Sequence, residues 1–124
     1  MTPQFIDHPV FMLKDVRETE DFYTAFLGIP MYFENDHLVY KTCDTSLFFV
    51  AAAEWAASDK DKSGLNHLAF GGKTDEELRD FERALNTGRI TNSGILIDKY
   101  GNKPYIWFDD PNGLRLEFYC RPSA

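Results

Sequence analysis

The sequence of 124 residues has only two cysteines, Cys43 and Cys120, and no long apolar run. Two cysteines are too few for a disulfide framework, so a reducing compartment is expected, with both thiols buried in strand-like segments. No run approaches the roughly 20 apolar residues that a membrane-spanning helix needs. The first residues also lack the basic region and apolar core of a signal peptide. These absences favour a cytoplasmic protein.

Basic residues are also scarce, because 13 Lys and Arg stand against 20 Asp and Glu, a formal charge of −7. Nucleic acids and anionic membranes attract basic surfaces, so neither is expected as a partner. Aromatic residues, in contrast, are abundant: 11 Phe, 6 Tyr and 2 Trp. This content supplies the core of a single compact domain.

The chain repeats itself at an offset of 59 residues, which takes His8 to His67 and Phe22 to Phe81. The expected secondary structure repeats as well, with N-cap signatures at Asp15 and Thr74. The first half is expected to contain a strand at 5–13, a helix that ends at Gly28, and strands at 31–34, 37–41 and 46–51. The second half is expected to contain a strand at 65–70, a helix that ends at Gly88, and strands at 90–93 or 95–98, 105–108 and 114–119.

These elements predict an α+β fold of two βαβββ repeats, residues 1–53 and 64–124, joined by a polar linker at 54–63. Residues on a strand alternate between the two faces of the sheet. The apolar set on the last strand belongs against the helices: Leu114, Leu116 and Phe118. The polar set therefore lines the opposite face: Arg115, Glu117 and Tyr119. We expect the two repeats to form a curved mixed sheet with one shared site on that face.

Three side chains are candidates for a metal site there. His8 and His67 begin equivalent strands, and Glu117 lies near the end of the second repeat. A single histidine at a strand start is more often an ordinary surface or core residue. An inward glutamate is harder to dismiss, because an unpaired carboxylate is costly to bury. Two imidazoles and a carboxylate form a facial set of three ligands that leaves positions open for substrate. His37 has no counterpart in the second half and is expected at a loop or strand edge.

The opening run from His8 to Asp15, with Asp21-Phe22-Tyr23 and Phe26-Leu27-Gly28, resembles the start of vicinal oxygen chelate proteins. The closing run from Trp107 to Glu117, with its Asp110-Pro111-Asn112-Gly113 turn, is similar to the last two strands of that family. The family includes glyoxalase I, extradiol dioxygenases, fosfomycin-resistance enzymes and bleomycin-resistance binding proteins. The resemblance covers nearly the whole chain and implies a divalent metal, a small-molecule substrate and a homodimer.

Family members place ligands at four strand positions, and three of them correspond to His8, His67 and Glu117. Alignment of the two repeat ends puts Phe48 at the fourth position, where glyoxalase I has a carboxylate. The remaining ligand set favours Fe²⁺ or Mn²⁺, and Zn²⁺ also suits it. Two departures disfavour ordinary catechol cleavage. Trp107 replaces the tyrosine of extradiol dioxygenases, and no histidine lies in the stretch 98–100. Fosfomycin modification is not favoured either, because Lys103 and Arg115 are the only nearby cations.

The expected substrate pocket is mainly aromatic, which suits a planar or apolar molecule that chelates the metal through two oxygens. Its expected lining residues are Phe48, Tyr105, Trp107 and Tyr119, with Trp55 from a loop. Tyr100 and Asp98 are candidates for proton transfer, and Arg115 for holding a substrate anion or orienting Glu117. Two functions stay open: a metal-dependent dioxygenase or lyase/isomerase, and a metal-free antibiotic-binding protein of the bleomycin-resistance type.

Overall fold

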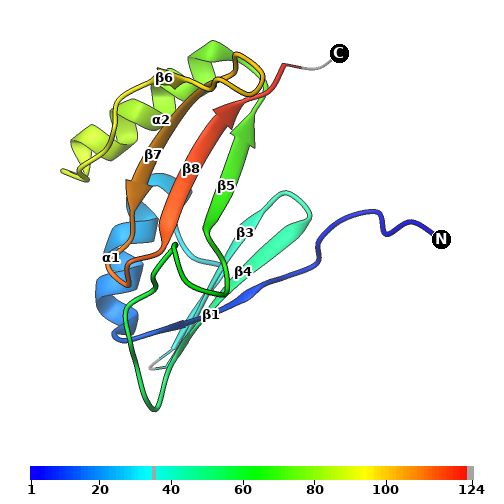
Figure 1. The fold of residues 1–124 in the computed structure, drawn as a ribbon. Helices are drawn as coiled ribbons and strands as arrows, with labels where there is room; N and C mark the ends of the chain where they lie inside the picture. Colours follow the sequence, from blue (N-terminus) through cyan, green and yellow to red (C-terminus); the bar gives the residue numbers. More distant parts are fainter. Residues whose placement is uncertain (35, 123–124) are drawn as a thin grey trace. The chain divides into compact units, whose positions relative to one another are not determined.

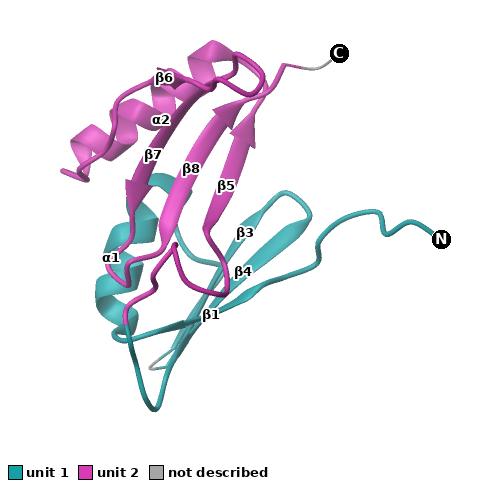
Figure 2. Cartoon of the chain, in the orientation of Figure 1, with its two compact units in different colours: residues 1–56 teal, residues 57–124 magenta. Residues whose placement is uncertain are grey.

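The computed structural model describes residues 1–34 and 36–122. The first repeat contains β1 (Val10–Leu13), α1 (Val16–Leu27), β2 (Tyr32–Glu34), β3 (His37–Thr42) and β4 (Thr45–Ala51) (Figure 1). The second contains β5 (His67–Gly72), α2 (Asp75–Thr87), β6 (Leu96–Ile97), β7 (Pro104–Asp109) and β8 (Arg115–Cys120). The predicted α+β fold of two βαβββ repeats is confirmed. The chain divides into two compact units, Met1–Ala56 and Ala57–Ala124, and this division falls inside the expected linker (Figure 2).

Each unit has one four-stranded mixed sheet, with the strand order β1-β4-β3-β2 in the first and β5-β8-β7-β6 in the second. The first strand of each repeat runs parallel to the last, and the other neighbours are antiparallel. In both sheets the first strand of the repeat pairs with the fourth, the fourth with the third, and the third with the second. The repetition seen in the sequence therefore extends to the pairing of strands.

Both helices begin where the sequence predicts. The Asp15 side chain accepts a hydrogen bond from the backbone N–H of Glu18 at 3.1 Å, and Thr74 accepts one from Glu77 at 3.1 Å. These bonds satisfy backbone donors that a helix start leaves open. Gly28 has a φ of 81°, which suits glycine and ends α1 at the expected place. Among the described residues, no helix is long and apolar enough to cross a membrane.

Three details of the sequence-based prediction are wrong. The first strand begins at Val10 rather than at residue 5, because Pro9 has no N–H to continue the ladder. The strand expected at 65–70 runs instead from His67 to Gly72, and its last two glycines pair with Tyr119 and Cys120. Cys120 is buried as expected. Cys43 is exposed in the tight turn between β3 and β4, with a φ of 52°. The turn expected at 35–36 includes Asn35, which lies outside the described residues.

Each sheet packs one face against the helix of its own unit. In the second unit Leu78, Phe81 and Leu85 of α2 are buried, and the Phe81 ring stacks on Phe118 at 4.3 Å. Leu116 is fully buried on the same face. The predicted alternation along β8 is thus confirmed. Its other set of side chains, which includes Glu117, lies on the face that α2 does not cover.

The first unit has an equivalent core under α1, in which Tyr40 is buried. The Tyr40 hydroxyl lies 2.8 Å from Thr24 Oγ1 and donates to the backbone carbonyl of Glu20 at 3.2 Å. Burial raises the pKa of Tyr40 to about 12 from its ordinary value of 10.0. Its hydroxyl therefore stays protonated in the folded chain at a pH where the unfolded chain has ionised.

This shift predicts an alkaline loss of stability. As pH rises from about 10 to 12, the unfolded state loses the Tyr40 proton first, so the free energy of unfolding falls by about 2–3 kcal/mol. Tyr40→Phe is expected to remove this part of the pH dependence while lowering stability at pH 7 by about 1 kcal/mol. Urea unfolding at a series of pH values measures both. The exposed Tyr100→Phe is the control, and equal slopes for Tyr40→Phe and wild type would contradict the assignment.

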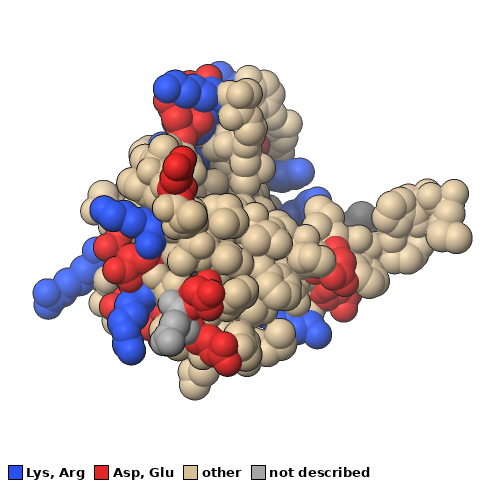
Figure 3. Space-filling view, turned by 90° about the horizontal axis from the view of Figure 1, so that it is seen from below, with Lys and Arg blue, Asp and Glu red and all other residues tan. Residues whose placement is uncertain are grey.

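Charged side chains of both signs are mixed on the surface. On the face shown in Figure 3, Lys and Arg side chains are interspersed with Asp and Glu side chains. The excess of acidic residues is thus spread among basic ones on this face.

Candidate metal centre

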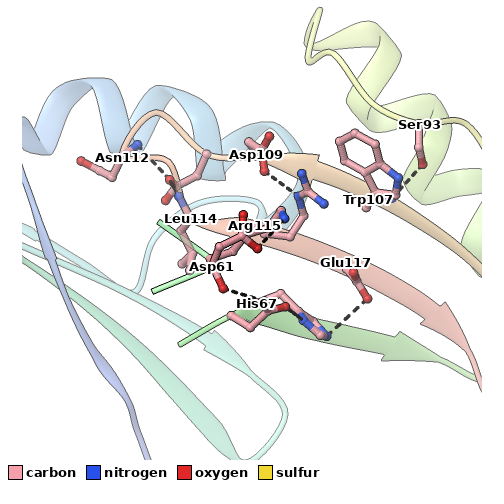
Figure 4. A network of polar contacts seen from close by, with 12 residues as sticks. Asp61, His67, Ser93, Trp107, Asp109, Asn112, Leu114, Arg115 and Glu117 are labelled. Atoms are coloured by element: carbon pink, nitrogen blue, oxygen red, sulfur yellow. Dashed lines mark hydrogen bonds and ion pairs between the residues drawn. The ribbon is translucent and has the colours of Figure 1, made fainter. Parts of the chain in front are cut away.

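His67 and Glu117 lie together on the face of the second sheet that α2 leaves uncovered. β5 runs parallel to β8 in a register that pairs His67 with Arg115 and Ala69 with Glu117. His67 Nε2 reaches diagonally across this register to within 3.4 Å of Glu117 Oε1 (Figure 4). The His67 side chain is 40% exposed and that of Glu117 is 13% exposed. Two of the three predicted ligands thus meet within one unit.

Asn66 holds the His67 ring. The Asn66 amide nitrogen donates to the backbone carbonyl of Lys60 at 2.7 Å, which turns its side-chain oxygen toward His67. That oxygen lies 2.7 Å from His67 Nδ1. Because an amide oxygen only accepts, Nδ1 must carry the proton. In the neutral ring, Nε2 then presents its lone pair to the Glu117 carboxylate.

The chemistry of this pair fits a divalent cation. A nitrogen lone pair and a carboxylate oxygen are both acceptors, so they do not hydrogen-bond to each other without an added proton. Two ligands that bind one ion at 2.0–2.2 Å are roughly 3.0–3.5 Å apart, and the pair is separated by 3.4 Å. Within residues 1–34 and 36–122, no group of three His, Cys, Asp or Glu side chains comes together closely enough to hold a metal. The pair therefore needs a further ligand.

His8 occupies the equivalent position in the first unit. There, Val10 pairs with Phe48 as Ala69 pairs with Glu117 in the second unit. The expected equivalence of Phe48 and Glu117 therefore agrees with the register. The ring of His8 lies 5.1 Å from that of Phe48, centroid to centroid. An apolar ring thus stands beside His8 where a carboxylate stands beside His67.

A side-chain oxygen of the preceding residue also contacts His8. Asp7 Oδ2 lies 2.7 Å from His8 Nδ1, which leaves Nε2 available. His37 has the same contact with Asp36 at 2.8 Å. An Nδ1 contact alone therefore does not mark a ligand. What distinguishes His67 is the carboxylate on the Nε2 side.

Arg115 lies beside the pair, between an aromatic ring and a carboxylate. Its guanidinium stacks on Trp107, 4.0 Å from the ring centroid, and its Nε donates to Asp109 Oδ1 at 2.7 Å (Figure 4). The Arg115 side chain is 19% exposed. Register explains the grouping, because Arg115 faces His67 on one side and Asp109 on the other. The structure thus fixes a cation next to the candidate ligands.

Two tyrosines continue the same face. The rings of Tyr105 and Tyr119 stack at 4.9 Å with an angle of 12° between their planes. Burial, the Glu117 carboxylate and a hydrogen bond with Asp98 raise the pKa of Tyr119. Tyr119 is therefore a proton donor toward Asp98 at neutral pH. Asp98, a predicted proton-transfer residue, therefore lies near the Tyr119 hydroxyl.

Tyr100 and Trp55, which were expected to reach the site from loops, each lie beside a lysine side chain. Tyr100 is 87% exposed in the turn before β7, where the Lys99 amine lies 5.4 Å from its ring. Trp55 belongs to the first unit and is 37% exposed, with the Lys14 amine 5.4 Å from its ring. Their assignment to a substrate site stays a prediction.

Sequence reasoning did not single out Asn66 or Asp109. The position of Asn66 before His67 carried no specific signal, since all three histidines follow a residue with a side-chain oxygen: Asp7, Asp36 and Asn66. Asp109 carried no signal either. Its pairing with Arg115 depends on the register of β7 against β8.

Comparison with known proteins identifies the family to which this fold belongs. Residues 5–118 match the model of the Glyoxalase/Bleomycin resistance protein/Dioxygenase superfamily. The chain belongs to this superfamily. No curated protein matches the chain.

Several solved structures are similar over nearly the whole chain. A glyoxalase family protein from Enterococcus faecalis is 27% identical, with a TM-score of 0.75 over 94% of this chain and 97% of that one. A putative glyoxalase from Bacillus halodurans is 21% identical, with a TM-score of 0.80 over 95% and 96%. A fosfomycin resistance protein from Listeria monocytogenes is 13% identical, with a TM-score of 0.75 over 97% and 95%. The last two show a shared fold only.

Proposed function

We propose that the protein is a divalent-metal-dependent enzyme acting on a small molecule that chelates the metal through oxygen atoms. Its reaction is of the dioxygenase or lyase/isomerase kind. The observation that carries this proposal is the His67–Glu117 pair, in which two metal-binding atoms face each other at 3.4 Å. Membership of a superfamily that includes such enzymes supports it.

In this proposal His67 and Glu117 supply two ligands and His8 supplies the third, from the same chain or from a second copy in a homodimer. Phe48 leaves the fourth position without a ligand. The set suits Fe²⁺ or Mn²⁺, and also Zn²⁺. The bound ion would act as a Lewis acid toward a substrate oxygen. Asn66 holds the His67 tautomer, and Tyr119 with Asp98 can hold a proton near the reacting molecule.

Metal titration tests the proposal. Metal-free protein titrated calorimetrically with Mn²⁺, Zn²⁺ and, without oxygen, Fe²⁺ is expected to bind about one ion per chain. His67→Ala is expected to weaken binding by about 100-fold or more, because it removes a ligand. His37→Ala is the matched control, since His37 also holds a neighbouring aspartate through Nδ1. Equal affinities for the two variants would contradict the proposal.

The second candidate is a metal-free binding protein of the bleomycin-resistance type. The stacked Tyr105 and Tyr119 rings beside Trp107 favour it, because an aromatic wall of this kind suits a planar ligand. Tight binding of an antibiotic by metal-free protein, unchanged in His67→Ala, would favour this candidate over the enzyme.

A further inference from the structure

Arg115 lies on the same face as the candidate metal ligands, where a substrate would bind. Its ion pair with Asp109 is made through Nε. Among the described residues no other hydrogen bond or ion pair of Arg115 occurs, so both Nη groups keep their donors. A guanidinium presents these donors as a fork that matches the two oxygens of a carboxylate. Arg115 thus keeps a complete carboxylate-binding edge.

The surroundings hold this edge in place. Stacking on Trp107 at 4.0 Å and the bond to Asp109 fix the plane of the guanidinium from two sides. With 19% of the side chain exposed, the fork is shielded from most solvent yet still reachable. A fixed cation loses little side-chain entropy when it binds an anion, so it binds more tightly than a mobile one.

The location of the fork connects it to the candidate metal ligands. Arg115 is the register partner of His67 and lies two residues before Glu117 on the same face of β8. Tyr105, Trp107 and Tyr119 continue this face as aromatic rings. A molecule bound here would meet a cationic fork at one end and flat apolar rings alongside.

We infer that Arg115 is the anion anchor of this site and that the substrate carries a carboxylate next to a flat apolar group. This inference deepens the proposed function and rests on it in treating the bound molecule as the substrate. Asp109 and Glu117 place two negative charges around the one positive charge of Arg115. A divalent ion bound by His67 and Glu117 would change the net charge of this group of side chains from negative to positive. Carboxylate binding and metal binding therefore strengthen each other, as linked equilibria must do reciprocally.

Calorimetric titration with phenylglyoxylate tests the inference, with its neutral methyl ester as the matched ligand. Wild type is expected to bind the acid more tightly than the ester, and Mn²⁺ to raise the affinity for the acid by roughly 5- to 150-fold. Arg115→Gln is expected to weaken acid binding by about 10- to 100-fold while leaving ester binding unchanged. Phenylphosphonate serves as a second anion and tests whether the fork distinguishes a planar carboxylate from a tetrahedral group.

Arg83→Gln is the control variant, because Arg83 also pairs with an aspartate, Asp80, but lies on α2, on the other face of the sheet. It is expected to bind the acid as wild type does. Arg115→Lys keeps a charge near Asp109 but loses the fork, so it provides the same test if Arg115→Gln does not fold. It is expected to weaken acid binding several-fold.

The outcomes separate the inference from the proposed function, because Mn²⁺ affinity is measured on the same samples. If the acid and the ester weaken equally in the Arg115 variants, or if neither changes, the anchor is overturned even though Mn²⁺ still binds. Arg115-dependent binding of the acid by a protein that takes up no metal supports the anchor and contradicts the proposed enzyme.

Discussion

Replacement of Glu117 by Gln is expected to weaken divalent metal binding by about 100-fold or more and to leave the metal-free fold at least as stable. The substitution keeps the shape of the side chain and removes its charge, and charge is what a carboxylate ligand supplies to the ion. In the metal-free chain the Glu117 side chain is 13% exposed, and its one ion-pair contact among the described residues is with Nε2 of His67, which is an acceptor in the neutral ring. Removing a poorly compensated, largely buried charge does not cost stability.

Two measurements on the same variants check this prediction. Calorimetric titration with Mn²⁺ and Zn²⁺ gives the affinities, and thermal unfolding of the metal-free proteins gives the stabilities. Glu76→Gln is the matched control, because Glu76 lies in the first turn of α2, which packs on the opposite face of the sheet. A Glu117→Gln protein that binds metal as tightly as wild type would show that the His67–Glu117 contact is structural.

Weaker metal binding without a loss of stability would distinguish a metal ligand from a structural residue. A structural residue loses stability and function together when it is replaced. A ligand-binding residue loses function while the unliganded fold is unharmed, because its environment was arranged for a charge that the ligand brings. Added metal should accordingly raise the melting temperature of wild type and have little effect on that of Glu117→Gln.

Elements with strong local signals could be predicted from the sequence. The helix starts at Asp15 and Thr74 follow from capping side chains within three residues. The burial alternation along β8 follows from its period of two. Strand ends were less accurate where glycine or proline interrupts a β pattern. Gly71 and Gly72 still pair in β5, although glycine is disfavoured in strands, because β8 continues to Cys120 and supplies their partners.

In the candidate site, too, some features could be predicted from the sequence and others could not. The equivalence of His8 and His67 is visible in the repeat, and with it the position of Phe48 opposite Glu117. Contacts that depend on register and side-chain direction are not visible. The Arg115 stack on Trp107 is one such contact, since a shift of one residue between β7 and β8 would place the two side chains on opposite faces.

The largest loss of stability is expected for Phe49→Ala, at about 3–5 kcal/mol. Phe49 is 1% exposed, and its ring lies 4.4 Å from that of Tyr23 and 5.3 Å from that of Phe11. Truncation to alanine would leave a cavity under α1 whose walls are large rings, and such walls relax only partly. Urea unfolding measures the loss as a change in midpoint at constant slope.

Phe118 provides the matched comparison, because it occupies the equivalent position in the second repeat. It pairs with Phe70 as Phe49 pairs with Phe11, but it is only partly buried, and its ring stacks on Phe81 at 4.3 Å. Phe118→Ala is therefore expected to cost about half as much as Phe49→Ala, since less apolar surface is lost from a less enclosed position. Equal losses for the two variants would contradict this reasoning. If the two units unfold in separate transitions, Phe49→Ala should shift only the transition of Met1–Ala56, and Phe118→Ala only that of Ala57–Ala124.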